Sequence, residues 1–143
     1  MNNLYLSCKQ FSGRWSYKRL FDNGSSGQGT VTFKKNNKNL IYSETGILNL
    51  INGSVLKSKR KYIYRLSRNK LEIYFYETPE ILFQTIKLKK KGSIFFGQST
   101  HQCKEDYYNS NYIFKIDSEF KITHNVFGPK KNYKSQTTYK KLY

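Results

Sequence analysis

Hydrophobic and polar residues alternate with a period of two along most of this 143-residue chain. Such alternation is typical of strands that bury one face and expose the other. Short polar or glycine-containing segments, such as 22–27, 67–70 and 128–131, interrupt it at hairpin-like intervals. The pattern predicts about ten strands, at 11–21, 29–33, 40–48, 55–66, 71–76, 82–88, 93–103, 106–116, 120–127 and 133–143.

The expected connections are short, so consecutive strands should pair as antiparallel neighbours in an up-and-down order. An open meander of this length would leave two exposed edges, which favours closure. We therefore predict an all-β fold, a single closed antiparallel up-and-down barrel of the lipocalin or fatty-acid-binding-protein type. Residues 11–143 would form the barrel domain, and residues 1–10 a short lead-in with one helical turn.

Composition agrees with a β-rich domain, because 17% of the residues are aromatic, with 13 Tyr and 10 Phe. The net charge of +17 is typical of proteins that bind nucleic acid or anionic membranes. However, only five of the 26 basic residues are Arg, and Lys and Asn are spread along the chain. The coding bias of an AT-rich genome would explain the same charge.

The chain has two cysteines, Cys8 and Cys103, which make neither a disulfide framework nor a zinc-ribbon motif. The N-terminal residues lack the basic and apolar regions of a secretory signal, and no apolar run approaches the ~18 residues of a spanning helix. These features predict a cytoplasmic protein with reduced thiols and no membrane span.

Polar side chains on the expected inner faces form a candidate site. Arg60, for example, falls on the same face as Tyr62, and the neighbouring lysines fall on the other face. His101 shares a face with Cys103 in the same way. The interior of a small barrel has room for one small ligand, and arginine is a natural partner for carboxylate or phosphate groups. The predicted ligand-binding residues are Arg19, Tyr42, Glu44, Arg60, Tyr62, His101, Cys103, Asp106, Tyr108, Lys131 and Tyr133. The favoured partner is a small anionic or aromatic molecule.

The same residues also fit a purely structural interpretation. Arg19, Glu44, Arg60 and Asp106 could pair with one another as a buried ion network that fixes strand register without any ligand. A third interpretation is catalysis by an isomerase, cyclase or decarboxylase, with His101 or Glu44 as acid or base and a tyrosine as donor. Fold type alone does not choose among these.

Metal binding is a further alternative, because His101, Cys103 and Asp106 are suitable ligand types for zinc or another transition metal. Only three ligands come from this hairpin, however, and His124 lies on another expected strand. Haem binding through His101 or His124 is related to this idea. The sequence identifies no cofactor.

Nucleic acid is a possible partner that the strand pattern does not favour. Binding of single strands needs aromatic rings on the lysine-bearing outer faces. The outer face of the expected strand 55–66 carries Lys57, Lys59, Lys61 and Arg65, and its only large apolar residue is Ile63.

A series of motifs in a constant order resembles a known family. The motifs are Gly13-Arg14-Trp15 with Arg19, Gly29 and Phe33; Leu40-x-Tyr42-x-Glu44-x-Gly46; Arg60-x-Tyr62-x-Tyr64; His101-x-Cys103-x-x-Asp106-x-Tyr108; and Gly128-Pro129-Lys130-Lys131-Asn132-Tyr133 followed by Thr138-Tyr139. This chain resembles the uncharacterised domain of unknown function 6314 family over nearly its full length. The resemblance implies a lipocalin-like barrel with a polar pocket and no established activity. The chain departs from the family pattern at His124-Asn125, where an aromatic residue is expected, and at Asn132, where an acidic residue is expected.

Overall fold

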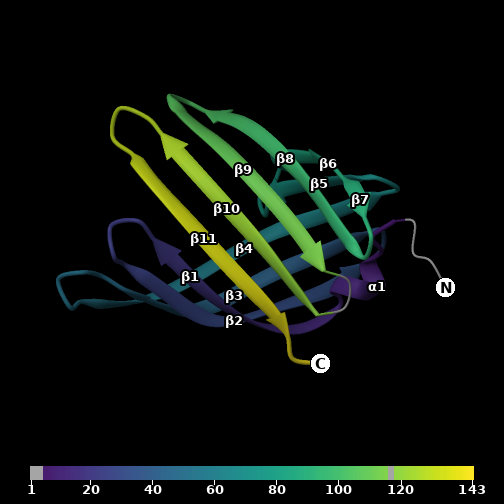
Figure 1. Ribbon diagram of the computed structural model, residues 1–143, viewed down its shortest axis with the longest axis horizontal. Coiled ribbons are helices and arrows are strands. Elements are labelled where there is room, and N and C mark those ends of the chain that lie inside the picture. The colour runs from purple at the N-terminus through teal and green to yellow at the C-terminus, as the bar shows by residue number, and fades with distance from the viewer. Residues whose placement is uncertain (1–4, 116–117) are drawn as a thin grey trace.

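The computed structural model describes residues 5–115 and 118–143 (Figure 1). The elements within them are α1 (Cys8–Phe11), β1 (Gly13–Phe21), β2 (Ser26–Asn36), β3 (Asn39–Asn49), β4 (Val55–Ser67), β5 (Lys70–Phe75), β6 (Ile81–Lys87), β7 (Lys89–Lys91), β8 (Ile94–Cys103), β9 (Asp106–Lys115), β10 (Glu119–Phe127) and β11 (Asn132–Lys141). The short strand β7 is the one addition to the ten expected strands. Residue 116, expected in the strand that became β9, and residues 1–4 of the expected lead-in lie outside the described residues.

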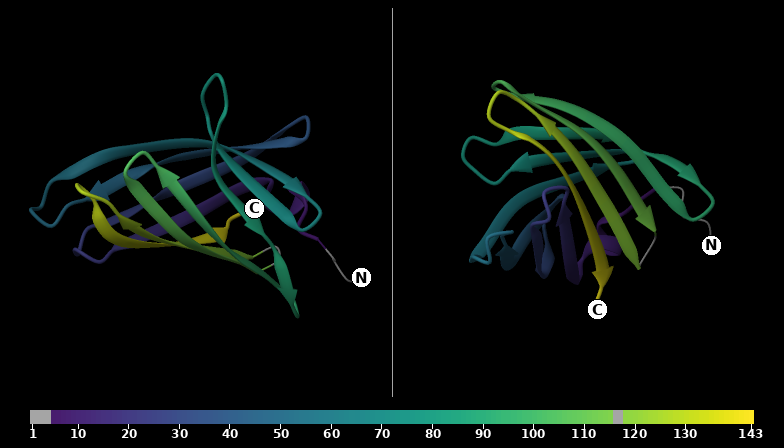
Figure 2. Two further views of the ribbon diagram at one scale, coloured as in Figure 1. Left: turned by 90° about the horizontal axis from the view of Figure 1, so that it is seen from above. Right: turned by 60° about the vertical axis from the view of Figure 1, so that its left-hand side comes forward.

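All the strands belong to one antiparallel sheet, in the spatial order β6-β5-β4-β3-β2-β1-β11-β10-β9-β8-β7. The first and last long strands pair directly, with Tyr17 opposite Tyr139. This confirms the predicted all-β, up-and-down barrel, whose curvature is plain in Figure 2. No helix in the described part of the chain is long and apolar enough to cross a membrane.

Closure of the barrel is nearly complete. The strands β6 and β8 lie side by side, but no ladder pairing joins them in the described sheet. They approach closely where a Cβ added to Gly97 would lie 2.5 Å from both the Ile86 side chain and the Lys87 carbonyl oxygen. Next to this point, β7 turns back to pair with the start of β8, so the β6 edge stays unpaired.

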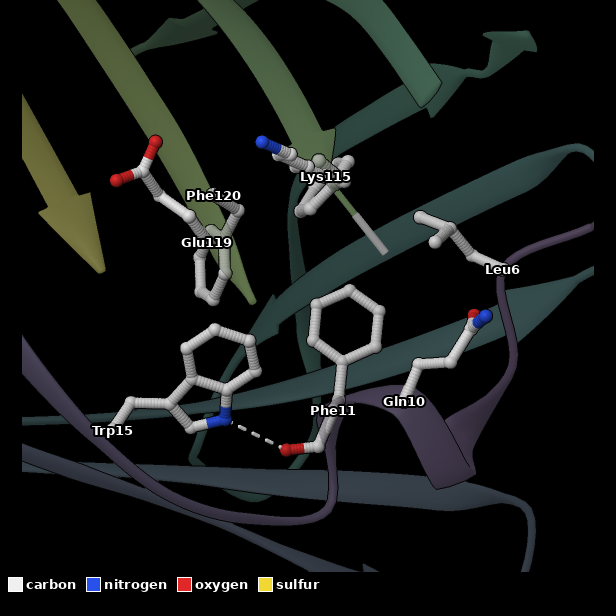
Figure 3. A pocket seen from close by; sticks show the side chains of 8 residues that line it. Leu6, Gln10, Phe11, Trp15, Lys115, Glu119 and Phe120 are labelled. Atoms are coloured by element: carbon white, nitrogen blue, oxygen red, sulfur yellow. Dashed lines mark hydrogen bonds between the residues drawn. The ribbon is translucent and has the colours of Figure 1, made fainter. Parts of the chain in front are cut away.

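The end of the barrel near both chain termini is plugged by α1 and aromatic rings. The indole Nε1 of Trp15 donates a 2.8 Å hydrogen bond to the carbonyl of Phe11, at the last residue of the helix (Figure 3). The Phe11 ring packs 5.2 Å from Phe33 and 5.5 Å from Phe114, measured between centroids. The pocket left here offers only about 10 Å³, which is room for one water at most.

Aromatic packing continues into the middle of the barrel. Tyr42 and Tyr64 stack with centroids 5.5 Å apart, and Phe120 stacks on Tyr139 at 4.1 Å. These rings are buried, so the middle of the barrel is a packed core. Inside the barrel, space for a ligand therefore lies on the side of these rings away from α1.

The opposite end carries the hairpins β1–β2, β3–β4, β5–β6, β8–β9 and β10–β11, because successive antiparallel strands place alternate turns at the same end (Figures 1 and 2). We call this end the open end. It holds the starts of β4, β9 and β11 and the finish of β8 and β10, where most of the predicted site residues occur.

Candidate functional site

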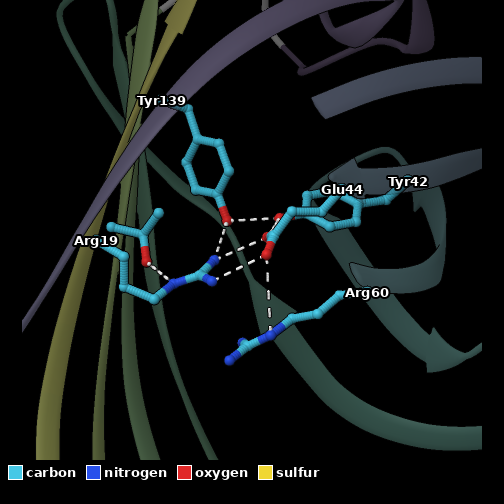
Figure 4. Close-up of polar contacts among 6 residues, drawn as sticks. Arg19, Tyr42, Glu44, Arg60 and Tyr139 are labelled. Carbon is cyan, nitrogen blue, oxygen red and sulfur yellow. Dashed lines mark hydrogen bonds and ion pairs between the residues drawn. The ribbon is translucent and has the colours of Figure 1, made fainter. Parts of the chain in front are cut away.

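A buried ion pair joins Arg19 on β1 and Glu44 on β3 inside the barrel (Figure 4). The two terminal nitrogens of Arg19 donate to the two Glu44 oxygens at 3.0 Å and 2.8 Å, and its Nε donates to Thr137 Oγ1 at 2.7 Å. The side chains are 7% and 0% exposed. Arg19 is therefore fully engaged inside the protein, in the bidentate geometry that arginine prefers with carboxylates.

Two tyrosine hydroxyls complete this network. Tyr42 donates a 2.5 Å hydrogen bond to Glu44 Oε1, and its oxygen lies 2.9 Å from the Tyr139 hydroxyl. Burial alone raises the pKa of Glu44, but the hydrogen bonds and charge of Arg19, with help from Tyr42, outweigh it and hold that pKa below its ordinary value. Glu44 is thus a fixed anion, which is a poor arrangement for proton transfer by this carboxylate.

Arg60 on β4 is placed differently. It pairs in register with Glu44, but its Nε lies 3.9 Å from Glu44 Oε2 and its side chain is 40% exposed. Its terminal nitrogens make no hydrogen bond to any described residue. The structural interpretation of the sequence, a self-satisfied ion network, therefore holds for Arg19 and Glu44 and only weakly for Arg60.

A cavity of about 30 Å³ lies beside Arg60, in the open half of the barrel. Its walls include Arg60, Tyr62, Phe83, His124 and Tyr139. A water molecule needs ~10–15 Å³ on this measure. The cavity therefore accepts a small polar group and excludes a larger ligand from the barrel centre.

His124 is a titratable lining residue that the predicted site did not include. The alternation of Phe120, Ile122, His124 and Val126 was the signal that could have placed it on the inner face of β10. Burial, together with the charges of Arg60 and Arg19, lowers the pKa of His124 to about 4. The ring is therefore neutral at pH 7.

The rim of the open end gathers most of the remaining predicted residues. Lys131 Nζ lies 3.7 Å from Asp106 Oδ2, and the Tyr133 ring packs 5.9 Å from Phe21. Burial and Tyr108 raise the pKa of Tyr133, while Arg60 and Lys131 lower it, which shows that these side chains are electrostatic neighbours. Asp106 therefore belongs to the rim, and the alternative that places it in an ion network with Arg19, Glu44 and Arg60 is wrong.

His101 and Cys103 share the inner side of β8, as the alternation predicts, but they stand apart from the ion pair. The His101 ring packs 5.5 Å from Phe83, and burial lowers its pKa. In the part of the chain that the structure describes, no three His, Cys, Asp or Glu side chains are close enough to hold a metal ion. The alternative of a metal site at His101, Cys103 and Asp106 is thus contradicted. Both cysteines are free thiols, as expected.

The predicted site thus separates into three groups. Arg19, Tyr42 and Glu44 form the buried network, and Arg19 and Tyr42 also line the cavity together with Arg60 and Tyr62. Asp106, Tyr108, Lys131 and Tyr133 surround the rim, with His101 and Cys103 to one side.

Comparison with known proteins supports the fold. A redesigned β-barrel aligns with a TM-score of 0.50 and 12% identity over 95% of each chain. A de novo designed fluorescence-activating β-barrel aligns with a TM-score of 0.47 and 10% identity over 94% of this chain and 96% of that one. At 12% identity the likeness to the redesigned barrel shows the fold and nothing about function. A search of curated proteins finds no significant match. Residues 11–141 match the family of unknown function DUF6314, and the chain belongs to that family.

Proposed function

We propose that the protein binds a small organic anion at the open end of the barrel, with the anionic group at Arg60. The observation that carries this proposal is the state of the Arg60 guanidinium, which lines the cavity while its terminal nitrogens lack a partner among the described residues. Arginine in this state offers paired donors to a carboxylate or phosphate.

The charge balance of the interior supports an anionic ligand. Arg19, Arg60 and Glu44 together carry two positive charges and one negative charge, and the neighbouring His124 is neutral. The surplus positive charge lies partly out of water, where an opposite charge is bound more strongly than at the surface. A ligand anion would compensate it.

The rim provides for the rest of such a ligand. Because the cavity holds only a small group, the body of the molecule must lie between the side chains of the open end. Tyr62, Tyr108 and Tyr133 offer apolar ring faces there together with hydroxyl groups, and Lys131 adds a second cation. Polar groups that fix the orientation beside apolar walls are typical of small-molecule sites.

Native mass spectrometry of the gently purified protein, compared with its denatured mass, tests the proposal. We expect a retained small molecule in the wild type and in an R14Q control, since Arg14 is a surface arginine at the plugged end, next to Tyr143. The R60Q variant should lose it while keeping a folded β spectrum. Equal retention by R60Q and R14Q would overturn the proposal.

A second candidate, nucleic-acid binding, gains one specific observation. The sequence places almost no large apolar residue on the outer face of β4, but Tyr74 on the neighbouring β5 and Tyr76, directly after β5, lie beside that face. Lys61 Nζ lies 4.4 Å from the ring centroid of Tyr76, and the Arg65 guanidinium lies 4.6 Å from that of Tyr74. The outer face of β4 itself carries no aromatic residue, as the sequence indicates, and the rings come from the adjacent residues.

A salt titration against single-stranded RNA separates stacking from charge. If Tyr76 stacks on a base, Y76A should weaken binding at constant salt, by about tenfold. Binding that disappears at moderate salt and is the same for Y76A would be non-specific attraction to a chain of net charge +17.

A further inference from the structure

A series of hydrogen-bonded polar side chains inside the barrel links Tyr112 to His124, and both of these residues line the cavity. The Tyr112 hydroxyl contacts Gln84 Oε1, and Gln84 Nε2 lies 2.7 Å from Ser110 Oγ. Ser110 Oγ in turn lies 2.5 Å from Nδ1 of His124. Tyr112, Gln84 and Ser110 are each no more than 2% exposed, so these contacts replace water for groups that cannot reach it.

The chemistry of these groups indicates which one donates and which one accepts in each hydrogen bond. An amide oxygen only accepts, so Tyr112 donates to Gln84. The Gln84 amide nitrogen only donates, so the Ser110 oxygen accepts from it. Ser110 has one hydroxyl proton and no other acceptor for it among the described residues, so that proton is satisfied only if Ser110 donates to His124 Nδ1. In a neutral imidazole the proton must then be on Nε2.

The second ring nitrogen of His124 is the one available to a ligand. Nδ1 is turned toward the buried Ser110, and the ring itself forms part of the cavity wall with Arg60. No hydrogen bond joins Nε2 to any residue in the described ranges. The cavity therefore has a charged donor from β4 and a neutral donor from β10.

We propose that the cavity selects a monocarboxylate, with one oxygen bound by Arg60 and the other accepting a hydrogen bond from His124 Nε2–H. This inference rests on the proposed function and names the class of anion. A single negative charge balances the surplus of one positive charge among Arg19, Arg60 and Glu44. A carboxylate head group has fewer atoms than a phosphate, which suits a cavity of about 30 Å³.

The tautomer of His124 is the first test, and it needs no ligand. A long-range ¹H–¹⁵N spectrum of the imidazole groups reports which ring nitrogen carries the proton. We expect the Nε2–H form in the wild type, and a mixture of tautomers in S110A, where the donor to Nδ1 is removed. A ring protonated on Nδ1 in the wild type would overturn the inference without touching the role of Arg60.

Binding of defined probes is the second test. Sodium acetate, acetamide and inorganic phosphate are titrated at constant ionic strength while the backbone amide resonances of Arg60 and Tyr62 are followed. We expect saturable shifts with acetate alone. Absence of saturable shifts with acetate would overturn this inference, and phosphate binding as tight as acetate would overturn the selectivity.

Two substitutions of His124 separate its donor from its structural role. In H124N the side-chain oxygen can accept from Ser110 but nothing replaces Nε2, whereas in H124Q the longer amide reaches toward the cavity. We expect H124N to weaken acetate binding about tenfold or more and H124Q to retain most of it. If R60Q abolishes binding and H124N leaves it unchanged, Arg60 keeps its role and His124 has none. If R60Q also binds normally, the proposed function itself fails.

Discussion

Arg19 and Glu44 face each other across the interior with two hydrogen bonds of 3.0 Å and 2.8 Å, and together they are almost completely buried. Such a pair satisfies itself, so its role is to hold β1 and β3 in place inside the barrel. The second arginine beside the same carboxylate, Arg60, is left with donors to spare. This asymmetry underlies both proposals.

Removing one partner of the buried pair should be costly. E44Q keeps the shape but leaves the positive charge of Arg19 buried without compensation, and we expect it to lower the free energy of unfolding by about 3 kcal/mol. Urea unfolding followed by Trp15 fluorescence measures this. The double variant R19M/E44Q removes the charge as well and should recover part of the loss. An E44Q protein as stable as the wild type would show that the pair is not structural.

Acid should destabilise the fold through His124. Its pKa falls from an ordinary 6.5 to about 4 in the folded protein, so the unfolded chain binds more protons between these values. The stabilisation is therefore present above pH 6.5 and is lost as the pH falls toward 4, by about 3 kcal/mol in total.

The charged groups that act on His124 are Arg60 and Arg19, and both oppose its protonation. Urea unfolding at several pH values tests the effect, and H124N should remove most of the slope between pH 6.5 and 4. A smaller slope should remain from His101, whose pKa is also lowered. Glu44 adds its own loss at lower pH, because its pKa is held below the ordinary value. Identical pH profiles for the wild type and H124N would contradict this assignment.

Gly46 allows β3 to pass directly beneath a buried tyrosine. A Cβ at this position would lie 2.2 Å from the Tyr17 hydroxyl and 2.2 Å from the Gln28 carbonyl oxygen. We expect G46A to destabilise the protein by about 2 kcal/mol, measured by thermal unfolding. G27A is a matched control, because its nearest neighbour, the Ile47 carbonyl oxygen, is 3.4 Å away. Equal stability of the two variants would show that the contact above Gly46 is not a packing constraint.

The rim carboxylate of Asp106 should oppose anion binding. It lies 3.7 Å from Lys131, whose side chain is 50% exposed, so the attraction is weak and screened by solvent. D106N keeps the shape and frees the lysine charge, and we expect roughly two- to threefold tighter acetate binding at low salt. The gain should shrink as salt is added. Weaker binding by D106N would show that Asp106 itself contacts the ligand.

Alternation along the strands was sufficient to predict the barrel and the inner faces. Arg19 and Glu44 are buried on the predicted faces, and Arg60 lies on the same face as the tyrosines. This follows because successive side chains of a strand point to opposite faces of the sheet. The same logic applied to residues 120–126 would have added His124.

Depth along the barrel axis could not be predicted in this way. Asp106 begins β9 at the rim, whereas Arg19 lies further inside on β1, and only the register between strands reveals this separation. The size of the cavity was equally hidden. It depends on how rings such as Tyr42 and Tyr64 stack across the interior, and stacking is a property of three-dimensional packing.

The location of a bound carboxylate tests the central claim most directly. A crystal structure of the protein with 4-bromobenzoate would place the bromine by its anomalous scattering. We expect the bromine at the open end, near the rim tyrosines, with the carboxylate within hydrogen-bonding distance of Arg60 and His124. Bromine found only on the outer surface of the barrel, with Arg60 turned to solvent, would contradict the claim.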